Sequence, residues 1–258
     1  MNSESEARPA ALVTGGAVRL GKAIALALAR AGYDIALHYN SSQGPADETA
    51  SEIRQEGAAC LTFQLNLRHA AEFDEFMGRI VTAFFQLAVL VNSASAYSQA
   101  IIADSSPDLF DQQFEVNLRA PFFLTQAFAT RVQSGNIINI IDNKIGFNQY
   151  QYAAYLLSKK ALVELTKMSA LEFAPGIRVN GVAPGVVLPA RERSQSYIDW
   201  RIQGIPLQQQ GKPEHITAAI LSLLDNPFIT GQVLVVDGGE SLTNSGRNAG
   251  DFPKAQDA

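Results

Sequence analysis

The stretch ALVTGGAVRLGKAIALALARAGYDIALHYN, Ala11–Asn40, has the pattern of a buried strand, a glycine-containing turn, a helix and a second strand. Gly15, Gly16 and Gly21 allow close backbone approach, and the start of the helix offers free N–H groups to an anion. Any tight turn favours glycine, so three glycines alone are weak evidence. Their position at the first strand–helix junction favours a binding site for the pyrophosphate of a dinucleotide.

The same alternation of short apolar runs and longer amphipathic runs continues along the chain. Predicted strands occupy residues 10–15, 34–39, 59–65, 88–94, 136–141, 177–183 and 232–237. Helix-like stretches lie near residues 20–32, 45–57, 69–85, 107–132, 150–174 and 213–224. Because the strands are almost continuously apolar, both faces of the sheet must be covered. The sequence predicts an α/β fold, a single-domain Rossmann-like doubly wound parallel sheet of about seven strands with helices on both faces.

The composition is that of one globular domain. The 258 residues can bury a sizeable core, expected over residues 8–239. Residues 240–258 are the expected C-terminal tail, in which SGRNAGDFPKAQDA, 245–258, is expected to be loose. A net charge of −5 indicates neither nucleic acid nor an anionic membrane as a partner. The lone Cys60 excludes an internal disulfide and fits a reducing compartment. No secretory signal and no membrane span is visible, so we expect a cytoplasmic protein.

The loop after the second predicted strand bears on the choice of dinucleotide. A site selective for NAD usually presents an acid there to bind the ribose 2′-hydroxyl. No acid occurs before Asp47, and this absence favours NADP(H), although the loop itself contains no arginine or lysine. Arg19 lies nearby on the glycine turn and would point toward the pyrophosphate or across the site toward the substrate. A solvated surface arginine is the alternative. The neutral donors of the loop are Asn40, Ser41 and Ser42.

Tyr155 and Lys159 form the pair with the clearest chemistry. Spaced by four residues, they share one face of the predicted helix over 150–174. We expect the ammonium to lower the pKa of the phenol toward working pH, which suits general acid–base catalysis. A chance pair on a wet helix face is the alternative, and the many apolar residues of this helix speak against it. No metal is predicted, because His38, His69 and His215 lack ligand spacing.

Over residues 8–239 the chain resembles the short-chain dehydrogenases/reductases. The matching pieces are TGGAVRLG, LVNSAS, Asn117 in VNLRAPFFL, Tyr155-x-x-x-Lys159, RVNGVAPG and ITGQVLVVDGG. The resemblance implies one NADP-binding reductase domain over 1–258 and a homotetramer. It also implies that Tyr155 donates a proton, that Lys159 positions the ribose and tunes the tyrosine, and that Asn117 maintains a water relay. The residues then expected to bind NADPH are Gly15, Arg19, Leu20, Gly21, Tyr39, Asn40, Ser41, Ser42, Asn66, Leu67, Asn92, Ser93, Ala94, Tyr155, Lys159, Pro184 and Gly185.

Two positions depart from the family pattern. Asn66 replaces the usual acid after the third strand, while keeping an acceptor oxygen for adenine. Asp142 replaces the usual catalytic serine thirteen residues before the tyrosine. A carboxylate would repel the alkoxide that develops in ketone reduction, whereas a C=N bond in a heterocycle needs a proton and its N–H groups need an acceptor. Asp142 therefore favours a nitrogen heterocycle as substrate.

Among these enzymes, the sequence resembles the pteridine reductases. The shared features are T-G-x-x-x-R-L-G, the H-Y ending of the second strand, Asp142, and an aromatic residue, Tyr97, after N-x-A-S. The resemblance implies that Tyr97 stacks a pterin against the nicotinamide, with loop packing as its alternative role. It implies reduction of dihydropterin or dihydrofolate-type substrates, with the expected contacts Arg19, Ser95, Tyr97, Asp142 and Tyr155.

Other interpretations stay open. A ketone or 3-oxoacyl thioester reductase of the same family is one alternative, and a non-enzymatic NADP-binding protein is another. Residues 186–211 belong to the variable substrate-covering region, where Pro189, Tyr197 and Trp200 would close over the ring. A plain surface helix is the alternative for this segment.

Overall fold

Seven parallel strands form one sheet in the computed structural model, which describes residues 8–189, 193–243 and 247. Their order is β3-β2-β1-β4-β5-β6-β7, which confirms the predicted doubly wound fold, and their bounds differ from the predicted ones by at most two residues. The strands are β1 (Ala10–Val13), β2 (Asp34–Tyr39), β3 (Cys60–Gln64), β4 (Leu87–Asn92), β5 (Gly135–Ile140), β6 (Ile177–Pro184) and β7 (Val233–Val236).

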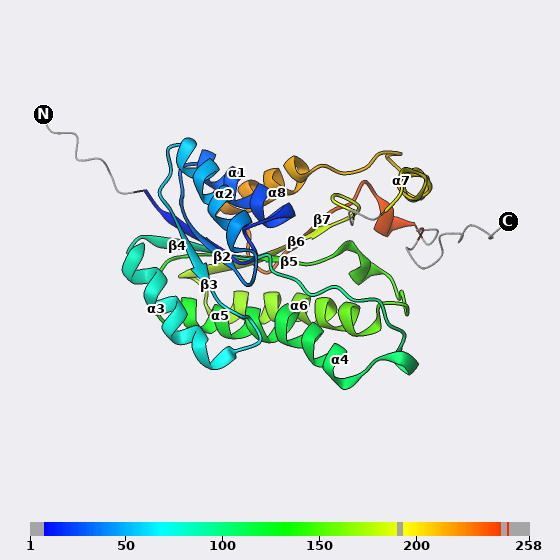
Figure 1. Ribbon diagram of the computed structural model, residues 1–258, viewed down its shortest axis with the longest axis horizontal. Helices are drawn as coiled ribbons and strands as arrows, with labels where there is room; N and C mark the ends of the chain where they lie inside the picture. The colour runs from blue at the N-terminus through cyan, green and yellow to red at the C-terminus, as the bar shows by residue number, and fades with distance from the viewer. Residues whose placement is uncertain (1–7, 190–192, 244–246, 248–258) are drawn as a thin grey trace, which may run out of the picture.

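Helices cover both faces of the sheet (Figure 1). One face carries α1 (Arg19–Arg30), α2 (Gln43–Gln55) and α8 (Pro213–Asp225). The other carries α3 (Phe73–Ala83), α4 (Pro107–Phe114), α5 (Ala120–Ala129) and α6 (Ala153–Glu172). Shorter turns are η1 (Ala70–Glu72), η2 (Ile102–Asp104), the π-turn η3 (Glu115–Arg119), η4 (Asn143–Gly146) and η5 (Glu240–Leu242). Within the described residues, no helix is long and apolar enough to cross a bilayer.

The side-chain alternation of β1 shows why its apolar run is continuous. Ala11 and Val13 are fully buried in the cluster that includes residues of α1, α2 and α8. Ala10 and Leu12, which point the other way, are buried in the cluster that includes residues of α3 and α5. Since both faces of the strand are covered, no position on it tolerates a charge.

The helix predicted over 107–132 is broken in the structure. It comprises α4, the π-turn η3 and α5. Pro121 lacks the N–H that would bond to the carbonyl of Asn117 four residues earlier, so the regular ladder is interrupted there. The wider π-turn carries Asn117, whose side chain is fully buried. Turns of this kind occur frequently at functional sites.

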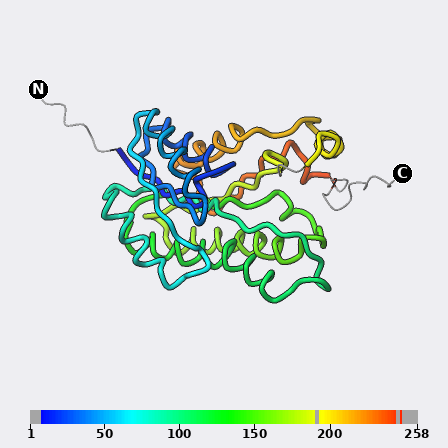
Figure 2. The backbone as a smooth tube through the Cα atoms, viewed as in Figure 1, coloured from blue at the N-terminus to red at the C-terminus, as the bar shows by residue number. Residues whose placement is uncertain are grey.

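The segments that follow β6 and β7 lie side by side beyond the sheet (Figure 2). The first contains α7 (Gln195–Ile202), so part of the segment predicted to cover the substrate is helical. Leu207 N–H donates to the Gly238 carbonyl at 3.1 Å, and the buried Arg201 and Glu240 side chains form an ion pair at 2.8 Å. Glu240, the first residue of the predicted tail, is thus held inside the fold. Residues 244–246 and 248–258 of the predicted tail lie outside the described residues.

Candidate functional site

The glycine turn after β1 packs against its neighbours too closely for any side chain. Gly15 has a φ of +63°, and a Cβ there would lie 2.9 Å from the Ala94 Cα. A Cβ on Gly21 would lie 2.1 Å from the Gly15 carbonyl oxygen. The first turn of α1 contains no acid, and Val18 at its N-cap makes no side-chain capping bond. The positive end of the helix dipole is thus left for an anion, as the dinucleotide prediction requires.

His38 at the end of β2 holds the turn in place, a role that the sequence did not indicate. Gly15 N–H donates to His38 Nδ1 at 3.0 Å, and the opposite nitrogen, Nε2, lies 3.0 Å from the Leu65 carbonyl. The imidazole is therefore neutral, with Nδ1 as acceptor and Nε2–H as donor. Burial lowers its pKa to about 4.

Acid should destabilise the protein through His38. Between pH 6.5 and pH 4 the unfolded chain takes up a proton that the folded imidazole refuses, so this contribution to stability is present above pH 6.5 and is lost as the pH falls. At pH 5 the loss is about 2 kcal/mol. Urea denaturation measures the free energy of unfolding at pH 8 and at pH 5. We expect its decrease between the two pH values to be about 2 kcal/mol larger in the wild type than in His38→Gln. An equal pH dependence in both proteins would contradict the assignment.

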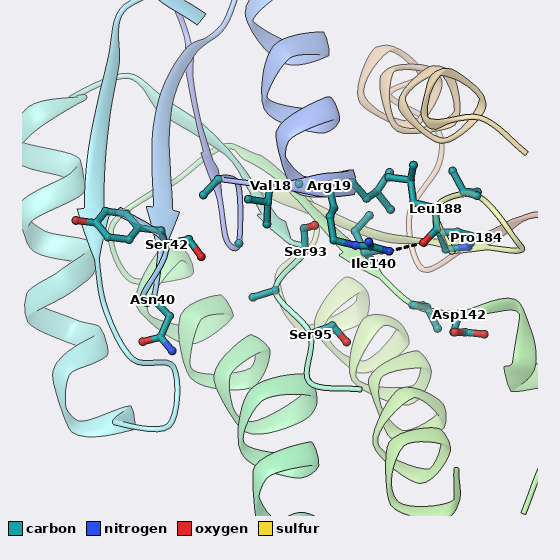
Figure 3. Close-up of a pocket in the computed structure, with 18 of the residues that line it drawn as sticks. Val18, Arg19, Asn40, Ser42, Ser93, Ser95, Ile140, Asp142, Pro184 and Leu188 are labelled. Carbon is teal, nitrogen blue, oxygen red and sulfur yellow. Dashed lines mark hydrogen bonds between the residues drawn. The ribbon is translucent and has the colours of Figure 1, made fainter. Parts of the chain in front are cut away.

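A cavity of about 450 Å³ opens at the carboxyl ends of the strands, beside the glycine turn (Figure 3). This edge, where the strand order reverses on either side of β1, is the usual ligand site of doubly wound sheets. Most residues predicted to bind the cofactor line it: Gly15, Arg19, Leu20, Gly21, Tyr39, Asn40, Ser41, Ser42, Ser93, Ala94, Tyr155, Lys159, Pro184 and Gly185. Lining residues that the sequence did not indicate are Ala17, Val18, Ile140, Ile141, Val187 and Leu188.

Three predicted cofactor contacts do not line this cavity. The Asn66 side-chain oxygen accepts the Arg68 N–H at 3.1 Å. Leu67 is buried in the core on the α3 and α5 side. The Asn92 amide donates to Asn139 Oδ1 at 2.8 Å, which ties β4 to β5. In the structure these side chains stabilise the loops and the sheet around the cavity.

Asp142, Tyr155 and Lys159 meet at the inner end of the cavity. The Tyr155 hydroxyl donates to Asp142 Oδ2 at 2.7 Å. Lys159 is buried and its ammonium donates to the Ile140 carbonyl at 2.8 Å, with Nζ 6.0 Å from the centre of the Tyr155 ring. Burial lowers the pKa of Lys159 to about 8.

The expected direction of the Tyr155 pKa is wrong. Burial and the neighbouring Asp142 carboxylate raise the pKa of this phenol well above its ordinary value. The Lys159 ammonium, which was expected to lower it, is turned to the backbone at Ile140. Tyr155 is therefore held in its protonated form, as a proton donor requires.

Asn117 braces the loop above the site. Its side-chain oxygen accepts the Ala96 N–H at 2.8 Å and the Ser95 hydroxyl at 3.1 Å. Its amide donates to the Ala96 carbonyl at 2.9 Å and to Ser158 Oγ, on α6, at 3.1 Å. The π-turn thus places one carboxamide where it joins the loop after β4 to the helix that carries Tyr155.

Arg19 is exposed and extends from the glycine turn to the segment after β6. It has a φ of +54°, in the left-handed region that residues other than glycine rarely adopt. Its guanidinium donates to the carbonyls of Leu188 and Pro189. Figure 3 shows it extended toward Leu188 and away from Asn40 and Ser42. Arg19 therefore lies between the cofactor cavity and the segment after β6.

A second cavity of about 540 Å³ adjoins the first and shares Arg19, Ser95, Asp142 and Tyr155 with it. All five predicted substrate contacts line this second cavity, including Tyr97. The Tyr97 ring is half exposed, stacks on Tyr152 at 4.8 Å and meets Tyr155 edge-on at 4.7 Å. Of the three residues predicted to cover the ring, Pro189 and Tyr197 line the cavity and Trp200 does not.

The sequence did not indicate several polar residues of the second cavity. They are Lys144, Arg193 and Arg201. Nothing in the described part of the chain brings together three histidine, cysteine or acidic residues that could hold a metal ion. Asp142 and Tyr155 line both cavities, and Lys159 lines the first.

Comparisons with known proteins agree with this arrangement. Residues 16–241 match the family model described as Enoyl-(Acyl carrier protein) reductase. The chain is 32% identical over 237 residues to the 3-oxoacyl-[acyl-carrier-protein] reductase FabG of Staphylococcus epidermidis, covering 89% of this chain and 97% of that protein. It is 33% identical over 287 residues to pteridine reductase 1 of Leishmania tarentolae, covering 93% of this chain and 99% of that protein.

A solved structure shows the same fold. FolM alternative dihydrofolate reductase 1 from Brucella suis, in complex with NADP, superposes with a TM-score of 0.86 at 31% identity, covering 91% of this chain and 96% of that one. The family match spans most of the sequence, and these relatives share about a third of their residues with it. The chain therefore belongs to the short-chain dehydrogenase/reductase family.

Proposed function

We propose that this protein is an NADPH-dependent pteridine reductase, which transfers hydride to a C=N bond in the ring of a dihydropterin or dihydrofolate-type substrate. The observation that carries the proposal is the position of Asp142. Its carboxylate lines both cavities and accepts the Tyr155 hydroxyl at 2.7 Å, and it forms no ion pair with any described residue. An acid turned outward and paired on the surface could not have taken part in the chemistry.

NADPH is the cofactor that suits the first cavity. The glycine turn and the start of α1 accept the pyrophosphate, and the neutral loop 40–42 lacks the carboxylate that would repel a 2′-phosphate. The related Brucella suis structure contains NADP. When bound, NADPH supplies the hydride.

Tyr155 and Asp142 supply the proton and orient the ring. The hydride adds to the ring carbon of the C=N bond, and the nitrogen takes a proton from the Tyr155 hydroxyl, which its raised pKa keeps protonated. The Lys159 ammonium lies 6.0 Å from the centre of the ring on which the resulting negative charge is left. Asp142 accepts hydrogen bonds from an N–H and an amino group of the ring through two separate oxygens, whereas a serine offers a single oxygen. Tyr97 offers an aromatic face at the mouth of this space.

A 3-oxoacyl thioester or ketone reductase is the second candidate. The FabG relative of Staphylococcus epidermidis is as similar to this chain as the pteridine reductase is. Its reaction needs a donor to the carbonyl oxygen, which Tyr155 provides. The carboxylate of Asp142 beside that oxygen is the feature that disfavours it.

We also propose a cytoplasmic homotetramer. The helices α4, α5 and α6 expose large apolar side chains, which a second copy would cover. The side chains concerned are Phe110, Phe122, Phe123, Leu157, Met168 and Leu171.

The test is NADPH oxidation with a panel of substrates. We expect turnover with dihydrobiopterin, dihydromonapterin or dihydrofolate that exceeds turnover with a 3-oxoacyl thioester by at least about 10-fold in kcat/KM. Oxidation in the absence of substrate is the control. Turnover of the thioester alone would overturn the pterin assignment and favour the second candidate.

A further inference from the structure

The second cavity is strongly cationic, although the protein as a whole is acidic. Arg19, Lys144, Arg193 and Arg201 line it, and Asp142 is the only carboxylate among the described residues that do so. The chain carries a net charge of −5, so this excess is local. A neutral ring would gain nothing from three of these cations, because only Arg19 stands beside Asp142 and Tyr155 in both cavities.

Arg201 on α7 has an unused donor. Its side chain is 2% exposed, and its Nη2 pairs with Glu240 Oε1 at 2.8 Å. Its Nη1 is buried and has no hydrogen-bond partner within the described chain. Buried guanidinium N–H groups are almost always satisfied, so a partner from a ligand accounts for this one.

The carboxylate beside Arg201 makes its other hydrogen bond elsewhere. Glu240 Oε2 accepts the Asn143 amide at 2.9 Å, and the same amide donates to Asp237 Oδ2 at 3.1 Å. Asp237 in turn accepts backbone N–H groups of Gly239 and Ser241. Both acids are therefore committed to bonds that join η4 to the segment after β7.

Lys144 places a second cation in the same cavity. It follows Asp142 and Asn143 in the chain, and its backbone N–H is fixed by Asp142 Oδ1 at 2.9 Å. The side chain is mostly buried, with Nζ 5.3 Å from the centre of the Tyr152 ring. No described acid forms an ion pair with it, which leaves a poorly hydrated ammonium facing the cavity.

We infer that the substrate carries an anionic oxygen group, a carboxylate or a phosphate, on a substituent of its ring, and that Lys144 and Arg201 bind this group. The inference rests on the proposed function and narrows it to acidic pterins, of which folates are the carboxylate form. Asp142 and Tyr155 hold the ring. Arg201 and Lys144, which line the same cavity, take the anion with charge-assisted hydrogen bonds.

The test compares KM values of the wild type for dihydrofolate, dihydroneopterin monophosphate and neutral dihydrobiopterin. We expect the KM of at least one acidic substrate to lie about tenfold or more below that of dihydrobiopterin, and this advantage to shrink in high salt. Whichever acidic substrate has the lower KM identifies the anion as carboxylate or phosphate. Equal KM values for all three would overturn the inference and leave the pterin function standing. Binding of NADPH without reduction of any pterin would overturn both.

Lys144→Gln tests the contact directly. We expect it to raise the ratio of the acidic to the neutral KM about tenfold, with kcat for the acidic substrate changed less than twofold. Lys160→Gln is the matched control, because it removes the same charge outside the cavity. Lys160 lies on α6, and its ammonium donates to Asn148 at an exposed position. Arg201→Lys keeps a cation for Glu240 but removes the second NH2 group of the guanidinium. It should also raise the ratio of the acidic to the neutral KM. Thermal melting verifies that each variant is folded. An unchanged ratio in both Lys144→Gln and Arg201→Lys would overturn the assignment.

Discussion

Serine in place of Asp142 should lower kcat/KM for dihydropterin by about 100-fold or more, with the Kd for NADPH changed less than about threefold. A serine hydroxyl still accepts one hydrogen bond and can cap η4, as Asp142 does through the Lys144 N–H. Its single oxygen cannot replace the two carboxylate oxygens as acceptors for the N–H groups of a ring, and it carries no charge. Steady-state kinetics and fluorescence titration of NADPH measure the two quantities. The same variant should gain turnover of a 3-oxoacyl thioester, because the repulsion of the developing alkoxide is removed.

Asp142→Asn separates charge from shape. Asparagine keeps the shape of aspartate without its charge, and its single oxygen remains as an acceptor where the carboxylate has two, one for the Tyr155 hydroxyl and one for the Lys144 N–H. We expect it to be nearly as impaired as the serine variant on dihydropterin. If both variants reduce dihydropterin at the wild-type rate, the carboxylate has no part in the reaction and the substrate proposal fails.

Alanine in place of Gly21 should raise the Kd for NADPH by about 10- to 100-fold. The new Cβ would lie 2.1 Å from the Gly15 carbonyl oxygen and 3.1 Å from the Gly16 Cα, and both are backbone atoms that cannot rotate away. The turn must therefore move off the start of α1, which spoils the anion site that the two form together. Titration of NADPH fluorescence measures the loss.

Gly78→Ala is the control for this change. Gly78 lies inside α3, and a Cβ there would meet nothing within 4 Å. The substitution should leave NADPH binding as it is and stabilise the protein by roughly 0.5–1 kcal/mol, because alanine favours the helix. Wild-type affinity in Gly21→Ala would show that the turn does not hold the pyrophosphate.

The fold could be predicted because its signals are local. The β1 strand is apolar throughout and the other central strands are mostly apolar, since helices cover both faces of the sheet. The predicted strand ends are wrong where the apolar residues continue beyond the last hydrogen bond between strands. The first predicted strand runs to Gly15, but β1 ends at Val13, and the residues after it turn into the cavity. The break at η3 depends on Pro121, whose effect on the helix was missed.

The candidate site likewise contains a part that local sequence predicts and a part that only the structure shows. The spacing of Tyr155 and Lys159 predicts that they share a helix face, and the place of Asp142 beside the tyrosine is what the family resemblance implies. The group formed by Asn143, Arg201 and Glu240 joins three distant segments, so no local pattern indicates it. The direction of the Tyr155 pKa also depends on packing. Only the structure shows that the Lys159 ammonium bonds to a backbone carbonyl while Asp142 contacts the phenol.

The loop after β2 separates two tasks that are often combined in one residue. The Asn40, Ser41 and Ser42 side chains line the cavity and form no hydrogen bond to the rest of the described chain, whereas Gly15 and His38 hold the turn itself. Substitutions in this loop can therefore change the preference between NADPH and NADH without disturbing the rest of the fold. During evolution this loop can change to suit the nicotinamide coenzyme that is more abundant in the cell, with almost no effect on folding.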